Sequence, residues 1–178
     1  MRVSKGGVMD LKRVFTFALS VSGILLLMTG CARQEARAII ELEKGGEIVI
    51  QFFPQDAPKT VKNFVKLARS GFYDGLTFHR VVEGFVVQGG DPKGDGTGDA
   101  GYNIDAEFSD RPHLTGTVAM ARSADPNSAS CQFYICLGPQ PHLDGKYTVF
   151  GQVVQGMDAV RGIKIGDRMK SVRIVAGR

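Results

Sequence analysis

The pattern of hydrophobic and polar positions from residue 38 onward is dominated by short stretches in which apolar and polar side chains alternate. Such alternation has the period of a β-strand, whose successive side chains point to opposite faces of a sheet. Ile48, Ile50 and Phe52, for example, would share the face turned toward a core. The sequence therefore predicts a mainly β domain with turns between the strands. The expected strands are residues 38–42, 47–52, 117–121, 132–137, 148–154 and 172–175.

Two segments have the spacing of an α-helix instead. Apolar residues recur at three- and four-residue intervals from Val61 to Ala68. Asp56 is placed to cap the start of this helix, and Gly71 stands where the helix should end. Residues 157–161 predict a second, shorter helix. We expect the first helix to cover the β-structure, not to form a site.

The most informative stretch is residues 78–91, where two apolar runs around a short turn predict a β-hairpin. If the loop has three residues, Arg80 pairs with Gln88, and Phe85 lies at the turn. If the loop has two residues, Arg80 faces Val87, because a slip of one residue turns each side chain to the other face. The pattern leaves both registers open, and in the second Arg80 would be an ordinary exposed arginine.

The chain has 178 residues and a formal net charge of +4. Residues 1–30 hold four basic residues and one acidic residue, so they account for +3 and leave +1 to the remainder. The basic character therefore belongs mainly to the first 30 residues, and the rest of the chain has no charge excess of the kind that binds nucleic acid.

The N-terminal region has the order of features found in export signals. Lys12 and Arg13 precede an apolar run over residues 14–28, which Gly30 and Cys31 follow. This ending resembles a bacterial lipobox, which implies cleavage before Cys31 and lipidation of that residue. Met28 stands where such motifs usually have leucine, valine or isoleucine, and Met9 offers a second start with an ordinary basic region.

The expected organisation is a lipoprotein-type signal peptide over 1–30, a polar tether over 31–37 and a folded domain over 38–178. The alternative is that the apolar run is retained as an anchoring helix. Both interpretations place the domain outside the cytoplasm and attach it to a membrane.

Three further features are interpreted as structural, so we expect no disulfide, metal site or dinucleotide-binding site from them. Cys131 and Cys136 would be about 16 Å apart in a strand, beyond the reach of about 7 Å that a disulfide allows, so we expect buried free thiols. The three histidines lack metal-ligand spacing, so we expect no metal. Residues 96–101 contain a formal Gly-x-Gly-x-x-Gly motif, but no helix is predicted to follow it, so we expect a surface loop.

Several motifs together resemble one family, the cyclophilin-type peptidyl-prolyl cis-trans isomerases. The resemblance covers roughly residues 38–176 and implies a closed eight-stranded antiparallel β-barrel, capped by two helices. The motifs that carry it are Phe78-His79-Arg80, Gln88-Gly89-Gly90-Asp91, Met120-Ala121-Arg122, Gln132-Phe133-Tyr134-Ile135, Leu143-Asp144-Gly145-Lys146 and Val149-Phe150-Gly151.

Rotation about an X–Pro bond must overcome a barrier of about 18–20 kcal/mol that comes from amide resonance. A catalyst needs an apolar pocket for the proline ring and a donor that stabilises the twisted bond, but it needs no nucleophile and no cofactor. The resemblance implies Arg80 as the catalytic cation and Gln88 as its catalytic partner. The substrate-binding residues that it implies are Phe85, Val86, Ala121, Arg122, Tyr134, His142 and Leu143.

The implied partners are proline-containing polypeptides among exported proteins, and a membrane through the lipidated Cys31. We expect a monomer. The alternative function is a proline-binding chaperone or assembly module without turnover. The presence of Arg80 together with Gln88 argues against this alternative, because binding alone does not need the arginine.

Four positions in or near the expected site depart from the family pattern. Val86 replaces a common methionine, His142 a common tryptophan and Tyr147 a common histidine. Tyr134 replaces a phenylalanine, and its added hydroxyl needs a hydrogen-bond partner if the ring is buried.

Overall fold

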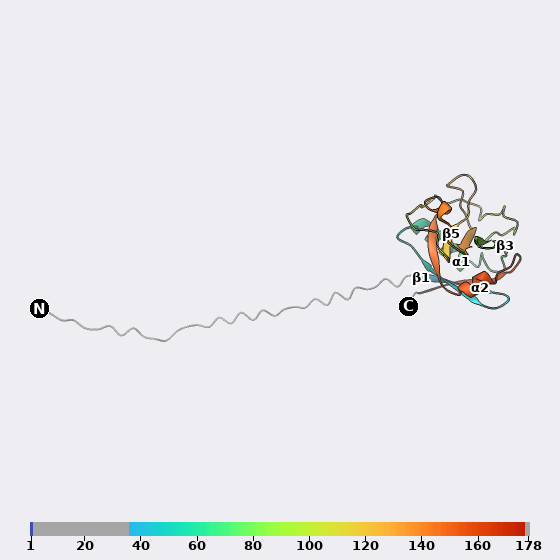
Figure 1. Cartoon of the computed structure of the whole chain (residues 1–178), viewed down its shortest axis with the longest axis horizontal. Helices are drawn as coiled ribbons and strands as arrows, with labels where there is room; N and C mark the ends of the chain where they lie inside the picture. Colours follow the sequence, from blue (N-terminus) through green and yellow to red (C-terminus); the bar gives the residue numbers. More distant parts are fainter. Residues whose placement is uncertain (2–35, 177–178) are drawn as a thin grey trace. The chain divides into compact units, whose positions relative to one another are not determined.

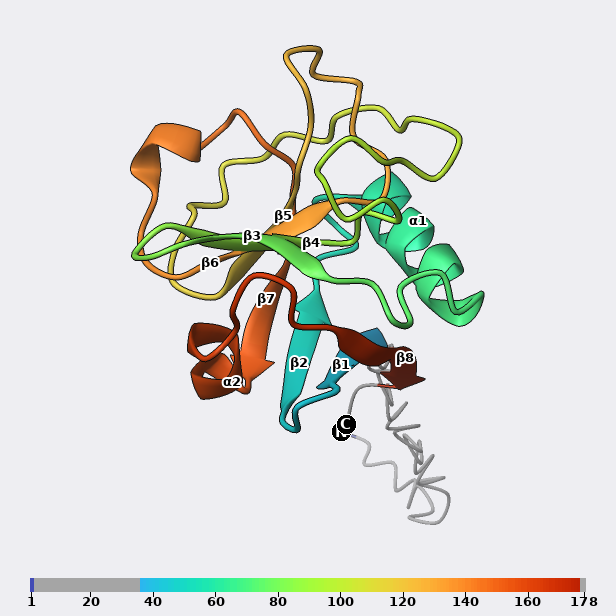
Figure 2. The same ribbon diagram turned by 90° about the vertical axis from the view of Figure 1, so that its right-hand side faces the viewer.

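The computed structural model describes residue 1 and residues 36–176, and in the second range the predicted mainly β architecture is confirmed. Eight strands form one antiparallel sheet that curls into a half-barrel (Figures 1 and 2), in the order β3-β4-β6-β5-β7-β2-β1-β8. The strands are β1 (Ala36–Leu42), β2 (Glu47–Phe52), β3 (Phe78–Val82), β4 (Val86–Gly89), β5 (Thr117–Met120), β6 (Phe133–Cys136), β7 (Val149–Gln155) and β8 (Met169–Ala176).

Within residues 36–176, the outer strands of this sheet, β3 and β8, are joined only where each strand begins and through the segments just before them. An isolated bridge pairs Thr77 with Arg168, and the Phe78 N–H donates to the Asp167 carbonyl at 2.8 Å. A continuous ladder between β3 and β8 is not among the pairings of residues 36–176. Full closure of the barrel therefore stays a prediction.

Both predicted helices are present: α1 (Pro58–Arg69) and α2 (Met157–Arg161). Helix α1 packs against β8 and α2 against β2, and Figure 2 shows the two helices well separated on different sides of the sheet. Helix α1 is followed by Gly71, as expected, with a φ of +72° that favours glycine. Among the residues that the structure describes, no helix has the length and hydropathy needed to span a membrane.

The start of α1 corrects one prediction. Asp56 does not cap the helix, because its carboxylate accepts a hydrogen bond from Arg111 at 2.7 Å. The carboxylate of Glu107 caps the helix instead. It accepts hydrogen bonds from the backbone N–H groups of Lys59 at 2.9 Å and Thr60 at 2.8 Å. A side chain from a distant loop thus satisfies the N–H groups that the first turn of a helix leaves unpaired.

The core of the half-barrel is centred on an aromatic cluster. The ring of Phe64 in α1 lies 4.9 Å from that of Tyr73, 5.4 Å from those of Phe133 and Phe150, and 5.7 Å from that of Phe52. All five side chains are at most 1% exposed. Aromatic side chains bury large apolar areas, so this cluster anchors α1 to the sheet.

The long loop between β4 and β5 is ordered by a buried carboxylate. Asp91 is 1% exposed and accepts the backbone N–H groups of Lys93 at 2.9 Å and Asp95 at 3.0 Å. No helix starts at the glycine motif in this loop, which confirms the prediction of a surface loop.

The two cysteines of the folded domain are free and buried, as predicted. Burial raises the pKa of Cys131 to about 11 and that of Cys136 to about 12, so both stay as uncharged thiols. The predictions for Cys31 and for the N-terminal signal concern residues outside the described range.

Candidate active site

The hairpin has the register that brings Arg80 to Gln88. Val82 pairs with Val86 and Arg80 with Gln88, so the loop has three residues, and the Phe85 N–H donates to the Val82 carbonyl at 3.0 Å. The choice that the hydrophobic pattern left open is thereby settled.

The sheet presents two different faces around this hairpin. Val87 and Ile135 pair with each other and belong to the aromatic core. The neighbouring pair, Gln88 and Tyr134, points to the opposite face, where Val86 and other apolar side chains form a second, smaller cluster. The candidate site lies on this second face, so its residues are placed by the alternation of side chains in β4 and β6.

Arg80 and Gln88 belong to a chain of hydrogen bonds. Arg80 Nη1 donates to Gln88 Oε1 at 3.1 Å, and Gln88 Nε2 donates to Gln132 Oε1 at 3.0 Å. Gln132 Nε2 in turn donates to the carbonyls of Gly96 at 3.0 Å and Gly98 at 2.8 Å. These loop carbonyls fix which end of each amide faces its neighbour, and they leave the Gln88 oxygen turned toward the guanidinium.

The sequence places Gln132 in a buried strand and in a family motif but does not predict it as a site residue. A signal was available, because Gln132 lies two residues before Tyr134 and must share its face in an extended chain.

An apolar pocket of about 180 Å³ opens beside Arg80. Its wall brings together every predicted catalytic and substrate-binding residue except His142, and it adds Tyr147. The lining residues are Arg80, Phe85, Val86, Gln88, Ala121, Arg122, Tyr134, Leu143 and Tyr147. His142 does not line the pocket, but its ring stacks on Phe85 at 5.6 Å between centroids.

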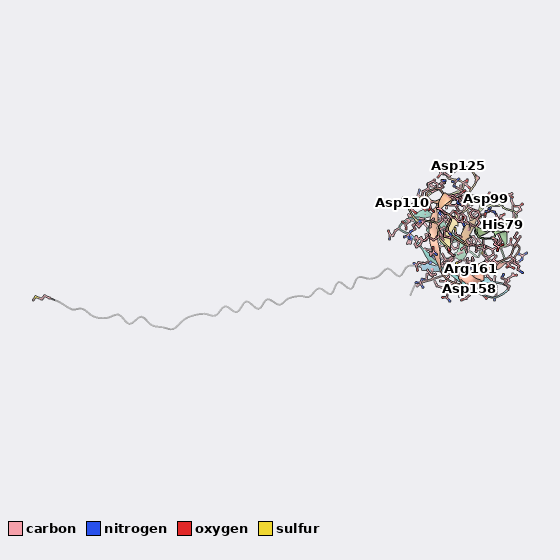
Figure 3. The ribbon with its side chains drawn as sticks, in the orientation of Figure 1. His79, Asp99, Asp110, Asp125, Asp158 and Arg161 are labelled. Atoms are coloured by element: carbon pink, nitrogen blue, oxygen red, sulfur yellow. The ribbon has the colours of Figure 1, made fainter. Side chains whose placement is uncertain are left out.

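The side chain of Arg122 ties two loops together at the rim of the pocket. Its guanidinium lies 4.5 Å from the Tyr147 ring centroid and donates to the carbonyls of Lys146 and Ser123, each at 2.8 Å. This contact of the Arg122 side chain is additional to the substrate-binding role that the sequence predicts for the residue. A second hollow of about 340 Å³ begins on the other side of Gln88 and extends to Asp99, which Figure 3 labels.

Tyr134 has the hydrogen-bond partner that its buried hydroxyl requires. The hydroxyl lies 3.0 Å from His113 Nε2, and His113 Nδ1 lies 2.9 Å from a carboxylate oxygen of Asp144. Burial raises the pKa of Tyr134, which keeps the hydroxyl protonated. Neither His113 nor Asp144 was among the predicted site residues.

Comparisons with known proteins agree with this geometry. Residues 38–176 match the family described as cyclophilin type peptidyl-prolyl cis-trans isomerase/CLD. The chain belongs to this family. It is a cyclophilin-type peptidyl-prolyl cis-trans isomerase, as the motifs predicted.

Two curated relatives are bacterial peptidyl-prolyl cis-trans isomerases. The peptidyl-prolyl cis-trans isomerase of Synechococcus elongatus is 56% identical over 141 residues, which cover 78% of this chain and 96% of the relative. Peptidyl-prolyl cis-trans isomerase B of Bacillus subtilis is 50% identical over 135 residues, covering 75% of this chain and 94% of the relative.

Solved structures extend the similarity to the fold of a eukaryotic cyclophilin. A crystal structure of a Cryptosporidium parvum cyclophilin has a TM-score of 0.74 at 28% identity and covers 81% of this chain and 99% of its own. The same protein, crystallised in the presence of the dipeptide Ala-Pro, gives a TM-score of 0.69 at 29% identity, covering 80% and 99%.

The carboxylate of Asp144, next to Leu143 of the cyclophilin site, is partly exposed, and its neighbours stabilise its charged form. The backbone N–H and the ring of His113 lower the pKa of Asp144 below its ordinary value of 3.8. A depressed carboxyl pKa contributes stability above the ordinary value, and this contribution disappears as the pH falls through the lowered value. We expect Asp144→Asn to lower the melting temperature at pH 7, by a margin that shrinks as the pH falls below about 4.

Thermal unfolding of both proteins between pH 7 and pH 2 measures this difference. Asp158→Asn is a suitable control, because the Asp158 side chain is fully exposed at the surface (Figure 3) and should matter little at any pH. A difference for Asp144→Asn that stays constant down to pH 2 would contradict the proposed cause.

Proposed function

We propose that Arg80 is the catalytic cation of this cyclophilin and that its substrates are X–Pro bonds of exported polypeptides. The observation that carries the first part is the Arg80–Gln88 hydrogen bond of 3.1 Å at the edge of an apolar pocket. Within residues 36–176 no carboxylate forms an ion pair with Arg80, so its charge is available to a ligand.

The pocket suits a proline ring. Val86, Tyr134 and Leu143 are buried to more than 90% and provide apolar walls, and Phe85 covers one side. A proline ring bound there would place its imide bond toward the guanidinium. In the planar ground state the imide nitrogen is a poor acceptor, because its lone pair is delocalised into the carbonyl. As the bond twists, the lone pair becomes available, and a donor placed beforehand stabilises the twisted state more than the planar one.

Gln88 has two parts in this proposal. Its side-chain oxygen accepts from Arg80 and so limits the directions that the guanidinium can take. We propose that Gln88 also hydrogen-bonds the substrate backbone, together with main-chain groups of Ala121 and Arg122, which line the same pocket. The substrate is held on both sides of the bond that rotates.

The test is isomerisation of a peptide containing an Ala-Pro bond by the full chain, followed by NMR exchange between the cis and trans resonances. Uncatalysed exchange takes tens to hundreds of seconds, so catalysis at a micromolar enzyme concentration is readily detected. Saturable acceleration supports the proposed pocket. Binding of the peptide without acceleration would contradict the role given to Arg80.

We also propose that the enzyme is exported, processed at Cys31 and anchored to the membrane by lipid on that residue. The support is the order of basic residues, apolar run and Gly30-Cys31 ahead of the folded domain. A single acyl chain holds a protein only weakly, so stable attachment requires two or more chains. Exported chains must complete the slow isomerisation of their X–Pro bonds outside the cytoplasm. An isomerase attached to the membrane would act on them there.

We expect the Cys31→Ser variant to lose lipid and to leave the membrane fraction. Mass spectrometry of the N-terminal peptide and fractionation of cells that produce each form measure this. Cys136→Ser is the matched control, because that thiol is buried within the domain and should not affect attachment. A Cys31→Ser protein that is still processed yet remains in the membrane fraction would rule out lipid anchoring. An N-terminal peptide of the unmodified protein that begins upstream of Cys31 would do the same and would favour a retained anchoring helix.

A further inference from the structure

His113 is a buried residue that joins two walls of the proline pocket without lining it. The residue is 1% exposed. Its backbone N–H donates to Asp144 Oδ1 at 2.7 Å, and its carbonyl accepts the Gln140 N–H at 2.7 Å. Its ring lies between the same Asp144 oxygen, at 2.9 Å from Nδ1, and the Tyr134 hydroxyl, at 3.0 Å from Nε2.

The chemistry of the partners assigns the protons in this chain. An ionised carboxylate can only accept, so the His113 Nδ1 carries the proton that points to Asp144. In the neutral ring Nε2 then accepts, and the protonated Tyr134 hydroxyl donates to it. The hydroxyl is therefore directed at a residue outside the pocket, and the face of the Tyr134 ring that meets the ligand stays apolar despite the added oxygen.

The two walls joined in this way belong to separate parts of the chain. Tyr134 lies in β6, whereas Gln140 and Asp144 flank the short 3-10 helix Pro141–Leu143, which carries Leu143 into the pocket. His113 precedes β5 and contacts both segments. The imidazole ring of His113 therefore provides a side-chain link between the tyrosine wall and the leucine wall.

We infer that His113 is a positioning residue that holds Tyr134 and Leu143 at the separation that a proline ring requires. This inference rests on the proposed role of the pocket. It concerns binding of the ring and not the rotation step, because His113 contacts neither Arg80 nor Gln88 in the hydrogen bonds of residues 36–176.

Two single variants break the same link from opposite sides. Tyr134→Phe keeps the aromatic wall and removes only the hydroxyl. His113→Asn keeps an amide donor near Asp144 but is too short to reach Tyr134. We expect each variant to raise the Kd for an Ala-Pro peptide about fivefold, and the double variant to raise it no further, because contacting residues are not additive. For His113→Asn, whose residue does not line the pocket, kcat at saturation should change less than twofold.

The matched control is Tyr102→Phe. The Tyr102 hydroxyl donates to Asn63 Oδ1 at 2.6 Å, beside α1 and away from the pocket, so its removal should leave the Kd unchanged. All Kd values are measured by titration well below the melting temperature of each variant, so that a loss of stability alone does not alter them. Nitrogen NMR of the His113 ring should show a protonated Nδ1 in the unmodified protein, whether or not a peptide is present.

The outcomes separate the two proposals. Unchanged Kd values in both single variants, with Nδ1 still protonated in the unmodified protein, would overturn the positioning role and leave the proposed function intact. Fivefold effects that multiply in the double variant would also overturn it, since the two residues would then act independently. Absence of peptide binding by the unmodified protein would overturn the proposed function and this inference together.

Discussion

Replacing Arg80 with alanine is expected to lower kcat for X–Pro isomerisation by about 10²–10³-fold, the usual loss when one donor to a transition state is removed. Arg80 is exposed in β3, so the fold should persist. Its guanidinium donates a hydrogen bond to Gln88 at 3.1 Å and lies 5.5 Å from the centroid of the Phe85 ring, so both contacts place it beside the pocket. The measurement is exchange NMR at saturating peptide, with circular dichroism to verify folding.

Two further variants sharpen this result. Arg80→Lys keeps the charge but loses the planar fork of donors, so it should recover only part of the lost turnover. Arg173→Ala removes an exposed arginine of β8, whose contact is a surface ion pair with Glu47, and it should leave kcat unchanged. Turnover in folded Arg80→Ala that equals that of the unmodified enzyme would rule out the proposed mechanism.

The Phe64→Ala variant is expected to lower the free energy of unfolding by about 3–5 kcal/mol, the range for removing a large aromatic side chain from a core. Phe64 contacts four other aromatic rings and is 1% exposed, so little of the lost contact can be regained by small movements. Domains of this size are stable by only about 5–15 kcal/mol. Denaturant unfolding at 25 °C measures the change.

Lys62→Ala is the matched control on the same helix. Lys62 is exposed, so this variant should alter the free energy of unfolding by no more than about 0.5 kcal/mol. A change below about 1 kcal/mol in Phe64→Ala would show that the aromatic cluster is not the main anchor of α1.

The sequence predicts the elements well because their signals are local. Alternation over six residues identifies β2, and the spacing of apolar residues identifies α1, both close to their observed bounds. The register of the β3–β4 hairpin is harder, since two loop lengths satisfy the same apolar pattern. The resemblance to cyclophilins selects the register that joins Arg80 to Gln88, and the structure has this register.

The supporting contacts of the site depend on partners that lie far apart in the chain. Gln132 is 44 residues from Gln88, and His113 is 31 residues from Asp144. Neither separation leaves a periodic pattern in the sequence. The same reason explains the error at Asp56: the local capping rule was reasonable, but Glu107 approaches from 48 residues away and occupies the helix start. Tertiary structure therefore decides which polar side chain forms a hydrogen bond with which backbone group.

The pairing of the first and last strands places the two ends of the folded domain next to each other. Ala36 is the register partner of Ala176, so their Cα atoms are about 5 Å apart. A linker of about three residues would span this gap. The exposed turn between β1 and β2 at residues 43–46 could then supply new ends. The domain thus meets the geometric requirement for circular permutation, in which the strands keep their neighbours in space while their order along the chain changes.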